Sequence, residues 1–295
     1  MIVNKETLAA AFAAFNTIYQ EAFGAYTPTF RQVAMEVPST TKEETYAWLG
    51  SFPKLSEWIG ERQVKNLKAS KYSIVNKDFE STVAVPRNDI EDDKIGLFKP
   101  MFAEMARSAA AHPDETVFGL LVNGFTELCY DGLPFFSAAH KVGKATVSNM
   151  DVPANNPAVP WFLLDTSRAI KPLVYQNRKS AQFTSMTDPE SDHVFKNKEF
   201  LYGVDSRDNV GFGLWQLGWG CKKALDSTSY AAARAGLGGM KNENGVPLGV
   251  KGTLLVVGPS NEAAARKLLT GETLANGESN PWKGTAELMV CPWMS

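Results

Sequence analysis

A long stretch of helical periodicity between residues 92 and 130 limits what this chain can fold into. Its apolar residues recur at helical spacing, at Ile95, Phe98, Phe102, Met105 and Ala109. Acidic residues between 89 and 93 precede the pattern, where negative charge stabilises a helix N-terminus. Pro100 indicates a late start or a kink, and the sequence HPDE interrupts the pattern once more. We therefore predict one long broken helix, or two helices in line.

The N-terminal segment predicts a second amphipathic helix, from residue 4 to residue 23. Asn4 can cap it, and Gly24 supplies a stop signal. Its apolar positions step by four and three, at Leu8, Phe12, Phe15, Tyr19 and Ala22. This helix either packs on its own domain or forms an arm that packs on a neighbouring subunit.

Residues 30 to 90 indicate extended structure. FRQVAMEV and ETYAWLG are typical of short strands. KASKYSIVNKDFESTVAVPR is rich in Lys, Ser, Val and Thr, which predicts a solvated two-stranded ribbon. Because such a ribbon is marginally stable alone in water, it must lie on its own chain or on another molecule.

The second half of the chain alternates strands and helices. Residues 141 to 160 are rich in Pro, Asn and Gly, which indicates a loop or linker. WFLLDTSRAIKPLVYQ predicts a buried strand, and strand-like segments follow on both sides of a charged turn near residue 190. From residue 223 onward, a helix, a strand and a helix predict a compact α/β unit. The fold class is therefore α+β with long extended excursions.

Composition restricts the classes of partner. Thirty basic and 32 acidic residues give a net charge of -2, so no long-range attraction to nucleic acid is expected. Partners are therefore expected to be proteins. Three cysteines without metal-binding spacing fit a reducing compartment and buried positions. With no apolar run near the ~20 residues of a spanning helix and no signal peptide, we expect a protein that is cytosolic when made.

Motifs for catalysis are weak. The stretch DGLPFFSAAH, residues 131 to 140, contains Ser137 and His140, which suggests a nucleophile and a base. Three residues apart is too local to define such a pair, and no GxSxG elbow surrounds Ser137. The acids of IEDD favour helix capping over a divalent cation. We therefore expect no enzyme, cofactor or metal, with a Ser/His hydrolase as an alternative.

Aromatic residues, by contrast, are plentiful in extended or loop-like segments such as YAWLGSFP, SEWIGER, LPFFSAAH and NPWKG. Neighbouring subunits can bury such side chains, since Trp, Tyr and Arg are favoured interface anchors. This pattern favours a protein that associates. The interface candidates are Phe12, Phe15, Tyr19, Trp48, Trp58, Glu61, Arg62, Phe135, Phe136 and Trp282.

Several stretches, in order along nearly the full chain, carry a family resemblance. They are VPSTTKEETYAWLGSFPKLSEWIGER, KDFESTVAVPRNDIEDDKIG, DGLPFFSAAH, WFLLDTSRAIKPLVYQNR, YGVDSRDNVGFGLWQLGWG, NGVPLGVKGTLLVVGP and NPWKGTAELMVCPW. Together they are similar to the Mu-like prophage major head subunits, the major capsid proteins of Mu-type tailed bacteriophages.

The resemblance implies the tailed-phage major capsid fold (HK97-like). It assigns an N-terminal arm to residues 1–30 and an extended β loop to residues 31–86. A peripheral domain with a spine helix and returning strands would cover residues 87–222. Residues 223–295 would be mainly an axial domain at the capsomer centre.

The resemblance also implies function by self-assembly. Copies would form hexamers and pentamers of an icosahedral head in the virion, assembled in the host bacterial cytoplasm around double-stranded DNA without sequence specificity. Separate scaffold, portal and, in related phages, decoration proteins would be partners, and no membrane would be involved. An encapsulin-like compartment that holds protein cargo is the alternative within the same fold.

Overall fold

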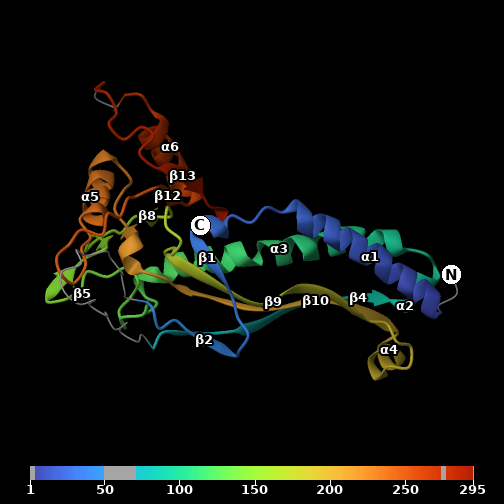
Figure 1. The fold of residues 1–295 in the computed structure, drawn as a ribbon. Helices are drawn as coiled ribbons and strands as arrows, with labels where there is room; N and C mark the ends of the chain where they lie inside the picture. The colour runs from blue at the N-terminus through green and yellow to red at the C-terminus, as the bar shows by residue number, and fades with distance from the viewer. Residues whose placement is uncertain (1–3, 50–70, 274–276, 295) are drawn as a thin grey trace.

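The computed structural model describes residues 4–49, 71–273 and 277–294. The molecule is elongated (Figure 1). Two long helices lie along a long sheet toward one end, and a second sheet with shorter helices lies at the other end. Helices and sheets are thus mixed, which confirms the predicted α+β class. None of the helices described is long and apolar enough to cross a membrane.

The N-terminal helix α1 (Lys5–Ala25) begins where the sequence predicts. The Asn4 side chain accepts a hydrogen bond from the backbone nitrogen of Thr7, and the Thr7 hydroxyl lies within hydrogen-bond distance of the Asn4 backbone nitrogen, which completes a capping box. The buried face of α1 packs on the long helix α3 (Lys99–Val122), with the rings of Phe15 and Phe102 4.2 Å apart. Of the two alternatives, α1 therefore packs on its own chain.

The long helical segment is reached through α2 (Arg87–Glu91) and the 3-10 turn η2 (Ile95–Phe98). Pro100 lies in the first turn of α3, where a proline costs no hydrogen bond, so the late start is confirmed. The break predicted at HPDE is wrong, because α3 continues through Pro113. Packing on α1 and on the sheet outweighs the cost of an interior proline, about 3 kcal/mol.

Helix α3 also ends earlier than the predicted residue 130. The 3-10 turn η3 (Asn123–Phe125) follows it directly. The backbone of residues 124 to 127 pairs with a later turn, since Gly124 and Glu127 carbonyls accept hydrogen bonds from the backbone nitrogens of Phe136 and Phe135. This tertiary pairing replaces the helical hydrogen bonds that the spacing predicts.

A four-stranded sheet lies under the two long helices, in the order β1 (Ala34–Pro38), β9 (Leu173–Met186), β10 (Glu199–Phe212), β4 (Lys77–Pro86). The hairpin of β9 and β10 carries the short helix α4 (Asp192–Asn197) at its tip, at the charged turn (Figure 1). Phe183 of β9 contacts the rings of Phe12, Tyr19 and Phe102, so the helices and this sheet share one core.

The solvated ribbon predicted before residue 86 does not form as a separate unit. Strand β4 pairs with β10 along its whole length, from Lys77 opposite Asp208 to Pro86 opposite Glu199. The preceding β3 (Ser73–Val75) pairs with β2 (Glu43–Thr45). The segment thus lies on its own chain as an edge strand, with partners that local sequence could not identify.

A five-stranded sheet forms the other end, in the order β13 (Glu287–Val290), β12 (Leu254–Val257), β8 (Trp161–Leu164), β11 (Gly218–Cys221), β7 (Met150–Asp151). Helices α5 (Ser227–Gly238) and α6 (Glu262–Thr270) belong to this end. Strand β8 is fully buried, as predicted. The unit predicted from residue 223 is not self-contained, because β7, β8 and β11 precede that boundary.

Short elements complete the fold. The segment predicted as a loop or linker after residue 140 contains a hairpin of β5 (His140–Val142) and β6 (Ala145–Val147). The remaining 3-10 turns are η1 (Phe30–Gln32), η4 (Trp215–Leu217), η5 (Pro259–Asn261) and η6 (Pro292–Met294).

Candidate functional site and predicted interface residues

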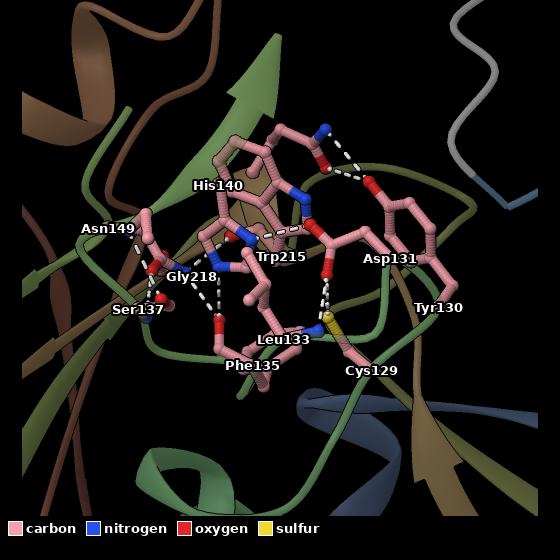
Figure 2. A network of polar contacts seen from close by, with 12 residues as sticks. Cys129, Tyr130, Asp131, Leu133, Phe135, Ser137, His140, Asn149, Trp215 and Gly218 are labelled. Atoms are coloured by element: carbon pink, nitrogen blue, oxygen red, sulfur yellow. Dashed lines mark hydrogen bonds and ion pairs between the residues drawn. The ribbon is translucent and has the colours of Figure 1, made fainter. Parts of the chain in front are cut away.

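The stretch DGLPFFSAAH forms a tight turn that follows η3 (Figure 2). The backbone nitrogen of Cys129 donates to the Leu133 carbonyl at 2.8 Å, and that of Gly132 donates to the Cys129 carbonyl at 3.0 Å. Gly132 has a φ of 79°, a conformation that favours glycine. The Asp-Gly pair therefore sets the backbone, as expected of a turn signal.

A pair formed by the buried His140 and the partly exposed Asp131 closes this turn. Nδ1 of His140 lies 2.6 Å from Oδ2 of Asp131, and Nε2 lies 3.2 Å from the Phe135 carbonyl oxygen. Both ring nitrogens therefore lie within hydrogen-bond distance of oxygen atoms of the turn. The His140 ring is fully buried and stacks on Trp215, with the ring centroids 4.0 Å apart.

The electrostatics of Asp131 follow from the same contacts. Burial alone would raise the pKa of its carboxyl. The hydrogen bond and positive charge of His140, with hydrogen bonds from Cys129 and Leu133, outweigh burial and hold the pKa below its usual range. Asp131 is therefore a carboxylate whose role here is to hold the turn.

The structure does not arrange Ser137 and His140 as nucleophile and base. The Ser137 hydroxyl accepts a hydrogen bond from the backbone nitrogen of Ala139 at 3.2 Å. The two nitrogens of His140 are already engaged with Asp131 and Phe135. A general base needs a free nitrogen directed at the nucleophile, so the hydrolase alternative receives no support.

Cys129, Asp131 and His140 also bring three metal-ligand types within 4.8 Å of one another. The contacts are those of a hydrogen-bond cluster, in which Cys129 Sγ donates to Asp131 at 3.2 Å and His140 Nδ1 pairs with the same carboxylate. Burial, together with the charge of Asp131, raises the pKa of the Cys129 thiol. In this structure the three side chains use one another as hydrogen-bond partners.

Asn149 connects this turn to the five-stranded sheet, and sequence reasoning missed it. Its amide nitrogen, with two hydrogens to donate, lies within hydrogen-bond distance of three carbonyl oxygens, those of Phe135, Trp215 and Gly218, at 2.8, 3.2 and 3.3 Å. Its oxygen accepts a hydrogen bond from the Ser137 backbone nitrogen at 2.8 Å. The Asn149 side chain is fully buried, and both its nitrogen and its oxygen have hydrogen-bond partners. No local motif marks such a residue, because its partners lie up to 69 positions away.

Four predicted interface residues lie inside the chain's own core. Phe15 and Phe135 are fully buried, and Tyr19 and Phe136 are 1% exposed. Phe15 packs on Phe102, and Phe135 stacks on Phe212 at 4.5 Å. These four side chains leave no surface for a neighbour in this conformation. Aromatic residues in loop-like sequence such as LPFFSAAH predict interface anchors, whereas in the structure the turn folds back and buries Phe135 and Phe136.

The other candidates differ in their surroundings. Phe12, Trp48 and Trp282 are half-buried and keep part of their surface exposed. Trp282 is held in place by a 2.7 Å hydrogen bond from its indole nitrogen to the Ser227 hydroxyl. Trp58, Glu61 and Arg62 lie outside the described residues, so their predicted place in an intersubunit loop stays a prediction.

Comparison with known proteins identifies the family. The family model described as Mu-like prophage major head subunit gpT matches residues 8–294. The major capsid protein of Escherichia phage Mu is 38% identical over 305 residues, covering 100% of both chains.

Two solved structures agree with that match. A chain of the bacteriophage JBD30 procapsid is 42% identical, with a TM-score of 0.87, and the match covers 99% of this chain and 100% of that one. A chain of the JBD30 capsid decorated with minor capsid protein trimers is 33% identical, with a TM-score of 0.79 and coverage of 90% and 91%. The fold is therefore the tailed-phage major capsid fold, and the chain belongs to the family of Mu-like prophage major head subunits.

Proposed function

We propose that this chain is the major capsid subunit of a Mu-like phage and self-assembles into hexamers and pentamers of an icosahedral head. The observation that carries the proposal is the end-to-end match to a procapsid chain, at 42% identity and a TM-score of 0.87. A likeness over 99% of the chain extends to both ends of the molecule, which are the parts that must meet neighbours.

The structure supports a role through shape and contacts. Large side chains fill the core within one subunit, including Phe15, Phe102, Phe135, Trp161 and Trp215. The subunit can therefore fold before it assembles, with assembly left to its exposed surfaces. The one Ser/His pair that suggested catalysis is occupied by structural hydrogen bonds.

We retain the division of the chain as part of this proposal, with one change. Residues 1–30 would be the N-terminal arm, although its helix α1 packs on α3 of the same chain. Residues 31–86 would be the extended loop, with β1 and β4 joined to the four-stranded sheet, and α3 would be the spine of the peripheral domain. The axial domain would include β7, β8 and β11 as well as residues 223–295, because these strands share one sheet with β12 and β13.

The partners follow from the same proposal. The head would enclose double-stranded DNA without sequence specificity, with separate scaffold and portal proteins, and would assemble in the host bacterial cytoplasm. The JBD30 capsid is decorated with minor capsid protein trimers, which supports a similar decoration of this head. The net charge of -2 is compatible with an inner surface that does not trap incoming DNA.

Light scattering combined with negative-stain microscopy of the purified protein tests the proposal. Closed shells, tubes or discrete capsomers are expected. A stable monomer at every concentration, even with the phage's scaffold protein added, would overturn it. Particles isolated from lysed host cells should contain nuclease-protected double-stranded DNA, and a protein cargo in its place would contradict the virion role.

A further inference from the structure

Three side chains of the types that bind metals converge at the turn between η3 and β5. Cys129 Sγ, an Asp131 carboxylate oxygen and a His140 ring nitrogen lie within 4.8 Å of one another. The Asp131 carboxylate lies between the other two, with one oxygen 3.2 Å from Sγ and the other 2.6 Å from Nδ1 of His140 (Figure 2). A thiolate, an imidazole and a carboxylate together form a donor set that binds Zn²⁺.

The surroundings of His140 fix its ring with Nδ1 directed at the other two side chains. Nε2 lies 3.2 Å from the Phe135 carbonyl oxygen and can donate its proton there. The ring is fully buried and lies parallel to that of Trp215, at an interplanar angle of 4°. A ligating histidine usually donates its second ring nitrogen to a carbonyl or carboxylate, which leaves the first nitrogen to coordinate the metal. The His140 ring is therefore already oriented as a metal ligand by contacts outside the cluster.

The backbone of the turn holds the other two side chains. The Cys129 nitrogen donates to the Leu133 carbonyl at 2.8 Å, and the Leu133 nitrogen donates to the Asp131 carboxylate at 3.1 Å. Tyr130 lies between the two ligands in sequence, and its hydroxyl is 3.1 Å from the side-chain oxygen of Gln216. Cys129 is 4% exposed, whereas the Asp131 side chain is 22% exposed. An ion can therefore reach the cluster past Asp131, and water can supply a fourth ligand.

Protons join the three side chains in the structure. One lies between Sγ and Oδ1 of Asp131 and another between Nδ1 and Oδ2, because the contacts of 3.2 and 2.6 Å are hydrogen bonds. A divalent cation that forms bonds to Sγ, Nδ1 and the carboxylate releases both protons to solvent. The net charge of the cluster then stays the same, so the ion adds no uncompensated buried charge. Neighbouring ligands of a tetrahedral zinc ion are roughly 3.3 Å apart, so the partly exposed Asp131 side chain would move outward.

We propose that Cys129, Asp131 and His140 bind one zinc ion, with water as the fourth ligand. The ion would join the turn to strand β5, since His140 begins that strand and lies nine positions after Asp131. Its role would be structural, and the proposal goes beyond shell formation without resting on it. The sequence predicts no metal here because Cys-x-Asp, with a histidine nine positions on, has no metal-binding spacing.

Cobalt substitution tests the proposal on unassembled subunits. The subunits are treated with a chelator, freed of it and titrated with Co²⁺, whose bond to a thiolate gives a charge-transfer absorption in the near ultraviolet. One equivalent of Co²⁺ should produce this absorption, and Zn²⁺ should displace Co²⁺, since thiolate ligands favour zinc. Zn²⁺ alone should raise the unfolding midpoint in a concentration-dependent way. The absence of both the absorption and the shift would overturn the proposal.

Cys129→Ser and Cys221→Ser separate this site from other thiols. Both cysteines are buried, and Cys221 lies outside the cluster. Cys129→Ser should lose the charge-transfer absorption and weaken Zn²⁺ binding by at least the ~10–100-fold that loss of an outer-shell partner costs. Cys221→Ser should bind both ions as the unsubstituted chain does. A charge-transfer absorption that persists in Cys129→Ser would contradict the assignment.

X-ray absorption of the zinc-loaded, unsubstituted chain keeps the test decisive if Cys129→Ser does not fold. One sulfur at about 2.3 Å and nitrogen or oxygen atoms at about 2.0–2.2 Å are expected around the zinc. A shell of nitrogen and oxygen without sulfur would mean an adventitious ion only and would overturn the proposal. None of these measurements depends on shell formation, so failure of the zinc site and failure of the proposed function are separate results.

Discussion

Asp114, in the middle of α3, accepts a hydrogen bond from the backbone nitrogen of Phe30 at 2.6 Å, across 84 residues of sequence. The same carboxylate accepts hydrogen bonds from the Tyr26 hydroxyl at 2.7 Å and from the Thr29 backbone at 2.9 Å. It is 1% exposed. The Asp114 side chain therefore holds the segment that connects α1 to the four-stranded sheet against helix α3.

Replacing Asp114 by Ala should lower the free energy of unfolding by about 3 kcal/mol, because the buried backbone nitrogen of Phe30, the part-buried backbone nitrogen of Thr29 and the Tyr26 hydroxyl lose their acceptor. Urea unfolding of unassembled subunits measures this loss. Glu115→Ala, at an exposed position on the same helix, is the matched control and should change stability by less than about 0.5 kcal/mol. Equal effects of the two variants would contradict the role of Asp114.

Asp131 predicts a dependence of stability on pH. Because its pKa is lower in the folded chain than its ordinary value of about 3.9, it stabilises the fold above that value. This contribution is lost as the pH falls through the lowered pKa. Asp131→Asn should therefore be less stable than the unsubstituted chain at about pH 7, with a smaller difference near about pH 3. Asp78→Asn, at an exposed carboxylate, is the control, and a pH-independent difference for Asp131→Asn would be evidence against the ion pair.

Gly220 and Gly119 should respond oppositely to alanine. A Cβ on Gly220 would lie 2.7 Å from the Phe136 ring and 2.9 Å from that of Phe125, so Gly220→Ala should destabilise by about 1–3 kcal/mol. A Cβ on Gly119, inside α3, meets nothing within 4 Å, and Gly119→Ala should stabilise by about 0.5–1 kcal/mol. Thermal unfolding of both variants is the measurement, and a Gly220→Ala variant that is as stable as the unsubstituted chain would show that the packing around β11 is described wrongly.

Replacing Phe15 should reduce the stability of the isolated subunit, and not only its ability to form shells. Its ring packs on Phe102 and meets Tyr202 edge-on at 5.0 Å, so Phe15→Ala should cost about 3–5 kcal/mol in isolated subunits. Denaturant unfolding checks this loss. Ala14→Ser, at the exposed neighbouring position of α1, should leave stability nearly unchanged. A stable Phe15→Ala subunit that fails only in shell formation would restore the original interpretation of Phe15 as an interface residue.

Trp58 and Arg62 carry the remaining prediction of an intersubunit loop. Trp58→Ala or Arg62→Ala should impair shell formation more than subunit folding, since large aromatic and Arg side chains anchor interfaces. Scattering during assembly, compared with the unfolding midpoint of the same preparation, separates the two effects. Normal assembly of both variants would show that the loop assignment is wrong.

Local sequence predicted those elements whose signals lie close together in the chain. Asn4 and the apolar spacing after it define α1, and Pro100 marks the start of α3, because caps and periodicity act within a few residues. Pro113 shows the limit, since tertiary packing keeps the helix continuous there.

Local sequence could not predict contacts between residues that are far apart in the chain. Nothing near β4 identifies β10 as its partner, and nothing near Asn149 identifies the carbonyls of Trp215 and Gly218. The side chains of Phe135 and Phe136 are apolar whether they face a neighbour or the core. Their burial depends on the turn, which folds back on β11 and brings the Phe136 ring next to Gly220.

The five-stranded sheet draws its strands from residues 150 to 290, with β12 joining β8 to β13. During synthesis, the long helices and the hairpin of β9 and β10 can form once residue 212 has emerged, since all their strands precede it. The other sheet lacks β12 and β13 until much later. A nascent chain can therefore complete the four-stranded sheet while the five-stranded sheet still lacks two of its strands, and that second sheet is complete only when residue 290 has left the ribosome.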